Sequence, residues 1–387
     1  MLSKNLVDKL YSIWYNIYKN IVELQIFTNN RMSKKIATLL IVAGLIYLFL
    51  LSINLMGEAF KLMGKDFATA LIKGTTNPFI GLFIGILTTS IIQSSSCTTS
   101  ILVGMVASGT LTIRNAIPIV MGANIGTTVT NTIVSIAHIA RRQEYAKAIG
   151  GATVHDFFNL ANVIVLFPLE IRFHIIEKAA KFLSPRMVHG GGLYFKSPLK
   201  LATQPVVKFI SGIIHHPIVL LVFSLALLFL SLWLFSNLLR YYVSARTEVY
   251  LEDKVFNNPL KSFGIGLLLT AIVQSSSCTT SIMVPLVASG ILTVEHIFPY
   301  VLGANIGTTV TALLASLATG VPASLTVAIS HLLFNLFGIC IIYPVRWIPI
   351  GLAKGLGNIS YKGRYMAIIY TLFIFFVLPL LLIFLTR

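Results

Sequence analysis

Long apolar runs separated by short polar connections dominate the chain. Runs of about 20 residues are long enough to cross the hydrocarbon core of a bilayer as helices. Such runs predict membrane spans at about 36–60, 115–139, 145–170, 217–240, 296–319, 324–345 and 365–386. Residues 1–35 instead mix aromatic residues with lysine and asparagine, which predicts an interfacial helix on the membrane surface.

Two further apolar stretches, about 66–110 and 250–292, are too long for one span. Each is interrupted in the middle by the same octapeptide, QSSSCTTS, at 93–100 and again at 274–281. A helical hairpin that enters the membrane and turns back at this octapeptide fits the length. Non-helical backbone is tolerated at membrane depth only where protein or a wet cavity surrounds it, so both tips are expected to face a site.

The octapeptide belongs to a much longer internal repeat. Residues 77–130 and 258–311 align at a constant offset with about 34 identities in roughly 54 positions. The match resumes with HDFFN at 155–159 and HLLFN at 331–335. Three predicted spans lie between the hairpins, an odd number, so the hairpins enter from opposite faces. This predicts an inverted-topology repeat.

The predicted fold is therefore an all-α polytopic membrane protein with two inverted repeats, each carrying one re-entrant hairpin. Repeat 1 covers 36–170 and repeat 2 covers 217–345, with an extracytoplasmic loop at 171–216 between them. Residues 346–387 provide a linker and a C-terminal membrane helix.

Composition and charge support this class. Of 387 residues, 56% are hydrophobic and 11% are charged, against about 25% charged in soluble domains. The net charge of +17 resides in connections between apolar runs, which indicates membrane orientation and anionic lipid rather than nucleic acid. Positive connections place the N-terminus in the cytoplasm, although the long basic loop at 171–216 then lies outside. The three cysteines form neither a disulfide framework nor a metal cluster.

Both tips carry groups that bind small ions. Hydroxyl and amide oxygens are ligands for a desolvated Na⁺, and hydroxyl and backbone N–H groups are donors for an oxyanion. Gln93–Ser96 and Gln274–Ser277 supply both kinds. Serine in membrane helices commonly just packs or bonds to the preceding turn. Here the apolar neighbours differ between the repeats while the polar positions do not, which favours a site.

The GANIGTT segment that follows each hairpin adds further polar groups. Its glycines predict a broken helix that would direct more donors to the same region of the membrane: Asn124, Thr127, Thr128, Asn305, Thr308 and Thr309. Neither motif contains lysine or arginine, so an anion bound here would be held by neutral donors and bound cations.

Asp156 is an ionisable residue inside an apolar span, and its counterpart in the second repeat is Leu332. Such a residue indicates a cation site or a proton-binding group. The structural alternative is a hydrogen bond to a neighbour such as His155. A nucleophile at Ser96–Cys97 is disfavoured because the motif lacks a strained nucleophile turn and is duplicated. We therefore predict a protein that is not an enzyme.

The chain resembles the type II sodium–phosphate cotransporters, including bacterial members. The resemblance rests on the doubled QSSS, on GANIGTTVTNTIV at 122–134 and on GATVHDFFN at 151–159, and covers roughly 50–345. It implies phosphate uptake driven by a sodium gradient, by alternating access, in a bacterial inner membrane. It further implies no cofactor, no metal other than sodium as the coupling ion, and a central phosphate site flanked by sodium sites.

The resemblance and the motifs together give two sets of site residues. The expected phosphate-binding residues are Gln93, Ser94, Ser95, Ser96, Asn124, Gln274, Ser275, Ser276, Ser277 and Asn305. The expected sodium-binding residues are Ser96, Thr127, Thr128, Asp156, Asn159, Ser277, Thr308, Thr309 and Asn335.

Asp156 stands where electrogenic relatives have an acid, whereas His138 and Arg141 stand where those relatives have Gln and Asp. Two alternatives remain open: cotransport of another small oxyanion, and a channel or regulatory membrane protein of the same fold.

Overall fold

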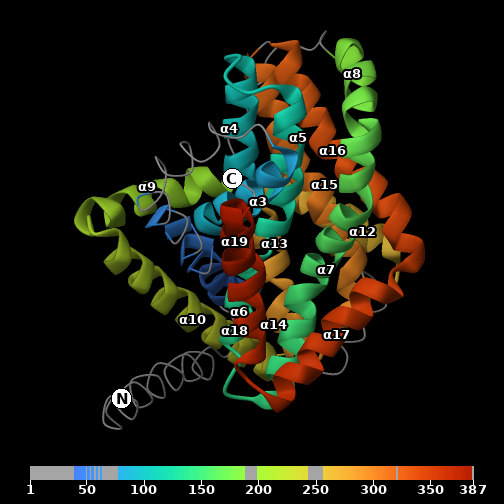
Figure 1. Cartoon of the computed structure of the whole chain (residues 1–387). Helices are drawn as coiled ribbons and strands as arrows, with labels where there is room; N and C mark the ends of the chain where they lie inside the picture. The colour runs from blue at the N-terminus through green and yellow to red at the C-terminus, as the bar shows by residue number, and fades with distance from the viewer. Residues whose placement is uncertain are drawn as a thin grey trace. The chain divides into compact units, whose positions relative to one another are not determined.

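The computed structural model describes residues 77–187, 198–242, 256–319 and 321–385, together with most of 39–62. The predicted interfacial helix at 1–35 lies outside the described residues. The chain divides into two compact units, Met1–Leu48 and Phe49–Arg387. In the first unit the described residues, 39–48, are helical. Everything below concerns the second unit, shown in Figure 1.

Helices, and no strands, make up the regular structure of the described residues. In chain order they are α3 (Pro78–Ile92), α4 (Ser95–Ala107), α5 (Ile113–Gly126), α6 (Val129–Ile136), α7 (Arg142–Phe173), α8 (Ile175–Met187), α9 (Pro198–Ile213), α10 (Pro217–Tyr242), α12 (Pro259–Val273), α13 (Ser276–Ser281), α14 (Met283–Ala288), α15 (Val294–Thr319), α16 (Pro322–Ile342), η2 (Tyr343–Val345), α17 (Trp347–Lys362), α18 (Met366–Leu372), the π-helical η3 (Phe373–Val377) and α19 (Leu378–Leu385). The helical fold class predicted from the sequence is confirmed.

Five helical stretches of the described chain are long and apolar enough to cross a membrane. They are Ile113–Ile136, Arg142–Phe173, Val294–Leu317, Pro322–Val345 and Met366–Leu385. Of the apolar window in the first, 89% is buried inside the protein, against 22% for the last. The C-terminal helix therefore lies at the edge of the bundle, and its exposed apolar residues suit contact with lipid. The chain is a multi-pass membrane protein.

Two segments predicted as connections are helical. The expected loop at 171–216 contains α8 and α9, and the expected linker after 345 contains α17. Helix α8 packs against α16, and α17 packs against α7. Each of these helices follows one repeat and covers the last long helix of the other.

The first helix of each hairpin packs directly on the helix that follows the hairpin: α3 on α5, and α12 on α15. The glycines of GANIG make this possible. A Cβ added at Gly122 would lie 1.9 Å from the carbonyl oxygen of Leu82, and one at Gly303 would lie 2.0 Å from that of Phe263. The backbones are in contact, as in other membrane helix pairs with small residues at the interface.

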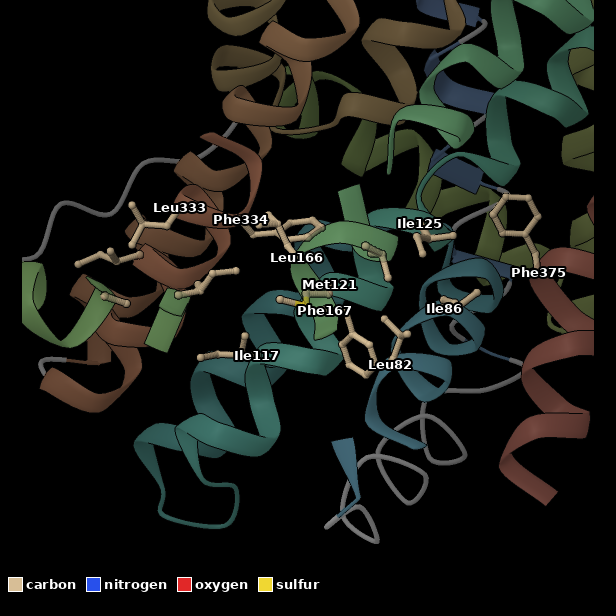
Figure 2. Packing of buried hydrophobic residues seen from close by; sticks show 14 of the residues in the cluster. Leu82, Ile86, Ile117, Met121, Ile125, Leu166, Phe167, Leu333, Phe334 and Phe375 are labelled. Carbon is tan, nitrogen blue, oxygen red and sulfur yellow. The ribbon is translucent and has the colours of Figure 1, made fainter. Parts of the chain in front are cut away.

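One apolar core cluster, around α3 and α5, contains residues of both repeats. Figure 2 shows Leu82 and Ile86 of α3 facing Met121 of α5, with Phe167 of α7 and Phe334 of α16 in the same cluster. This packing fixes α3 and α5, and with them the first helix break, against helices of the other half of the chain.

Candidate binding site at the two helix breaks

The QSSS motif breaks the helix in the same way in both repeats. Helix α3 ends at Gln93, which has φ of 58°, and α12 ends at Gln274, which has φ of 55°. The left-handed conformation is uncommon for residues other than glycine and costs on the order of 1–3 kcal/mol. Ser94 and Ser275 then cap the next helix, because their Oγ atoms accept hydrogen bonds from the Cys97 and Cys278 N–H groups at 3.2 and 3.3 Å. The break predicted from the sequence is confirmed at both positions.

The two tips, Gln93–Ser96 and Gln274–Ser277, lie against each other although about 180 residues separate them in the chain. Ser96 Oγ donates to the backbone carbonyl of Gln274 at 3.3 Å. Ser277 Oγ donates to the carbonyl of Thr127 at 3.2 Å, where the chain passes between α5 and α6. The structure thus joins tip 1, tip 2 and the first GANIGTT segment.

Helix α6 holds both hairpins. Thr130 Oγ1 donates to Gln93 Oε1 at 2.6 Å, which fixes the glutamine of tip 1. The Oδ1 atom of Asn131 accepts hydrogen bonds from Thr280 at 3.1 Å and from Ser281 at 2.8 Å, both beyond tip 2. One short helix of repeat 1 therefore fixes the relative position of the two motifs.

Four asparagines and two histidines bring the second halves of both motifs together. His155 Nε2 lies 2.6 Å from Asn305 Oδ1, and Asn305 Nδ2 donates to Asn159 Oδ1 at 2.9 Å. Asn159 Nδ2 donates in turn to the carbonyl of Asn124 at 2.9 Å. All four residues are buried.

The same pairs of residues meet with the repeats exchanged, although here the GANIG asparagine accepts the amide hydrogen bond. His331 Nε2 lies 3.2 Å from Asn124 Oδ1, and Asn335 Nδ2 donates to the same oxygen at 3.3 Å. In each case a histidine and an asparagine of one repeat bind the GANIG asparagine of the other. The two repeats therefore build one shared polar centre.

The threonines of GANIGTT are bonded within their own helices. Each hydroxyl donates to a carbonyl three or four residues earlier: Thr127 to Ala123, Thr128 to Ile125, Thr308 to Ala304 and Thr309 to Ile306. A hydroxyl that donates in this way keeps lone pairs for a cation. These four hydroxyls are thus oriented acceptors.

Ser95 and Ser276 differ from the other serines of the motif. Both side chains are buried, yet their hydroxyl groups make no hydrogen bond within the described part of the chain. Each lies in the first turn after its helix break, beside a serine that donates to a backbone carbonyl of another segment. These two hydroxyls are available to a bound anion.

The carboxylate of Asp156 is completely buried, and neither of its oxygens has a hydrogen-bond partner in the described part of the chain. His155 binds Asn305 instead, so the structural alternative of a His155–Asp156 hydrogen bond is not observed. The hydroxyl groups of Thr128 and Tyr370 face the carboxylate without a hydrogen bond of ordinary geometry. A buried carboxylate costs several kcal/mol unless it is neutralised, so this group requires a cation or a proton.

A model of the Na⁺/Pi-cotransporter family matches residues 48–176 and 227–353, which is more than half of the chain. The chain belongs to the Na⁺/Pi-cotransporter family. This confirms the resemblance seen in the motifs and the prediction of a transporter rather than an enzyme.

The individual proteins to which the chain is similar carry names that match this family. Sodium-dependent phosphate transport protein 2B of Homo sapiens is 32% identical over 445 residues, covering 89% of this chain and 64% of that protein. The 2B protein of Pongo abelii gives 32%, with 89% and 65% covered, and the 2A protein of Rattus norvegicus gives 31%, with 90% and 68% covered. The chain spans just under two thirds of the two 2B proteins. No solved structure matches it.

The GANIGTT segments correct one prediction. The helix is broken in the first copy, where a turn at Thr127 and Thr128 separates α5 from α6, but α15 runs unbroken through the second copy. The glycines therefore serve close packing and do not by themselves break a helix. In the first copy the residues after the break hold both hairpins. In the second copy Ala312 stands in place of Asn131, and Thr311 Oγ1 has no hydrogen-bond partner among the residues that the structure describes.

His138 and Arg141 form a cluster with Glu144 that is separate from the site. His138 Nδ1 lies 3.6 Å and Arg141 Nη1 3.1 Å from the Glu144 carboxylate. Burial lowers the pKa of His138 below its ordinary value, although Glu144 acts in the opposite direction. Neither residue bonds to the Asp156 carboxylate.

Sequence reasoning missed three residues of the site: Thr130, Asn131 and Tyr370. Asn131 could have been found from the sequence, because it aligns with Ala312 of repeat 2 just as Asp156 aligns with Leu332. Both losses of symmetry add a polar group to repeat 1. Tyr370 lies outside the repeats, so no alignment within the chain points to it.

Proposed function

We propose that the chain is a sodium-coupled symporter that imports inorganic phosphate. The observation that carries this proposal is the contact between two identical tips, from Ser96 to the Gln274 carbonyl. Beside it lie the hydroxyl groups of Ser95 and Ser276, which have no hydrogen-bond partner among the described residues. The names of the relatives, all sodium-dependent phosphate transport proteins, support the choice of ions.

In this proposal the phosphate binds between the tips. Ser95 and Ser276 donate their hydroxyl protons to phosphate oxygens, and the free first-turn N–H groups of α4 add donors at a helix N-terminus. Ser94 and Ser275 shape the turns, and Gln93 and Gln274 form the breaks that present them. Asn124 and Asn305 support the tips through the polar centre.

Sodium ions supply the positive charge that the described tips lack. One set of ligands consists of Asp156, the Thr128 hydroxyl that faces it, and Asn159 one turn further along α7. Tyr370 completes this set from the C-terminal helix. The second set consists of side-chain oxygens without a carboxylate: Ser96, Thr127, Ser277, Thr308, Thr309 and Asn335.

The transport cycle follows from this charge balance. One sodium orders the tips, phosphate joins it, and the neutralised site then permits the change that opens it to the other side. The repeats, 36–170 and 217–345, have inverted topology and exchange roles in this step. The N-terminus is cytoplasmic and the membrane is a bacterial inner membrane.

The test is binding of radiolabelled phosphate to the purified full chain by scintillation proximity, in sodium and in choline. We expect binding only in sodium, with displacement by unlabelled phosphate and arsenate but not by sulfate. Equal binding in choline would contradict sodium coupling. Displacement by sulfate as effective as that by phosphate would show that the cargo is another oxyanion.

A further inference from the structure

A cavity lies away from the tips, at the opposite end of hairpin 2 (α12–α14). Its volume is about 300 Å³, at the lower end of the range for small-molecule pockets. It is enclosed by the first turns of α7, the turn at Gly290 that follows α14, the start of α15 and one side of α17. Tip 2 lies at the other end of α13 and α14, so this cavity is distinct from the proposed phosphate site.

The rim of the cavity is polar and basic, and its floor is apolar. Lys147, Thr293, Lys354 and Asn358 line it and are exposed at their side chains. The floor consists of buried residues: Gly150, Val287, Leu292 and Val294. An inorganic anion would contact only the rim, whereas an amphiphile with an anionic head would contact both surfaces.

The charges at the rim leave an excess of positive charge. Lys354 forms an ion pair with Glu295, the acidic group in the first turn of α15. Lys147 has no carboxylate partner in the described part of the chain, and its Nζ lies at Gly290. Thr293 accepts the His296 N–H at 3.3 Å, and its hydroxyl group also faces the Glu295 carboxylate.

The exposed residues around this rim suit a position at the membrane–water boundary. The exposed side chains of α17 include Trp347, Leu352, Ile359 and Tyr361, a set of aromatic and aliphatic residues typical of the interface. Basic pockets between membrane helices at this level suit the head groups of anionic lipids.

We propose that this cavity binds an anionic phospholipid. The phosphate of the head group lies between the ammonium groups of Lys147 and Lys354, Thr293 and Asn358 donate to its oxygens, and the apolar part of the lipid covers the floor. The bound lipid bridges α7 and α17 to the end of hairpin 2.

The test is native mass spectrometry of the purified full chain titrated with phosphatidylglycerol and, separately, with phosphatidylcholine. We expect tighter binding of phosphatidylglycerol, and about tenfold weaker binding in the double variant Lys147→Gln, Lys354→Gln. Glu295→Gln frees Lys354 and should strengthen binding several-fold. The matched control is Lys178→Gln on α8, an exposed lysine away from the cavity, which should leave the affinity unchanged.

Three results would overturn the proposal. Equal affinity for the two lipids would mean that the rim does not discriminate between lipids by the charge of the head group. Unchanged affinity in the double variant would place the lipid elsewhere on the protein. Displacement of phosphatidylglycerol by millimolar inorganic phosphate would make free phosphate the occupant.

Discussion

At the scale of single residues, the serines of the two tips have different hydrogen-bonding roles. Ser94 and Ser275 cap helices, and Ser96 and Ser277 bond to backbone carbonyls. The protein leaves only the hydroxyl groups of the second serine in each motif, Ser95 and Ser276, without a partner in the described chain. The tip serines whose hydroxyl groups have no hydrogen-bond partner among the described residues are thus the ones assigned to the ligand.

Replacement of Ser95 or Ser276 by alanine should lower phosphate uptake sharply without loss of folded protein. A hydrogen bond to a charged group contributes about 1.5–3 kcal/mol, so the affinity for phosphate should fall roughly tenfold or more. The measurement is sodium-dependent uptake in proteoliposomes with equal amounts of protein. Ser108→Ala and Ser289→Ala, at the opposite ends of the hairpins, are the controls. Unchanged uptake in both tip variants would contradict the assignment of the phosphate site to the tips.

Tyr370→Phe deletes only the hydroxyl that faces Asp156. Because this oxygen is a proposed sodium ligand, the sodium concentration for half-maximal uptake should rise several-fold, while the phosphate dependence at saturating sodium stays close to that of the unmodified chain. Tyr365→Phe, an exposed residue that precedes the same helix, should change neither value. If the sodium dependence of uptake is unaltered in Tyr370→Phe, the tyrosine hydroxyl is not a sodium ligand and the side chain only packs.

At the scale of helices, the GANIG glycines set the distance between the first helix of each hairpin and the helix that follows the hairpin. These pairs are α3 with α5 and α12 with α15. Gly122→Ala and Gly303→Ala should each lower thermal stability by about 1–3 kcal/mol or more, because the new methyl group meets a backbone carbonyl. Gly104→Ala is the control, since nothing lies within 4 Å of its added Cβ. The midpoint of thermal unfolding in detergent distinguishes them. Equal midpoints for Gly122→Ala and Gly104→Ala would contradict the close approach of α3 and α5.

The repeat offers a matched pair for the role of α6. Thr130→Val removes the hydrogen bond to Gln93, worth about 1 kcal/mol, and should lower uptake about fivefold. Thr311→Val changes the equivalent residue of repeat 2, whose hydroxyl has no hydrogen-bond partner in the described part of the chain, and should have little effect. Equal losses in the two variants would mean that α6 has no special role in holding tip 1.

Periodicity and repeats predicted the long helices and the break at each QSSS, because apolar length and an exact duplication are local signals. They did not predict α8, α9 and α17, which are helices in segments with charged residues or prolines and owe their place to tertiary packing. The unbroken α15 shows the same limit. Glycine spacing is compatible with a break or with close packing, and only the neighbouring backbone decides between them.

At the scale of the whole chain, the proposed site is built from contacts that cross between the repeats. Asn124 and Asn305 each bind a histidine and an asparagine of the opposite repeat. Symmetric contacts of this kind suit a site that opens alternately to two sides. The asymmetric residues, Asp156 and Asn131, add charge and anchoring to repeat 1. Tyr370 could not be found by alignment within the chain, since its helix has no counterpart in the repeats.

The central claim is that a sodium gradient drives phosphate through a site at the two tips, with Asp156 as the charged cation ligand. The most direct test is phosphate accumulation in proteoliposomes under an imposed sodium gradient and a clamped membrane potential. The account predicts accumulation above equilibrium, abolished when the sodium gradient is collapsed, and accelerated by an inside-negative potential in the unmodified chain but not in Asp156→Asn. Equilibration without accumulation, indifferent to sodium, would contradict it.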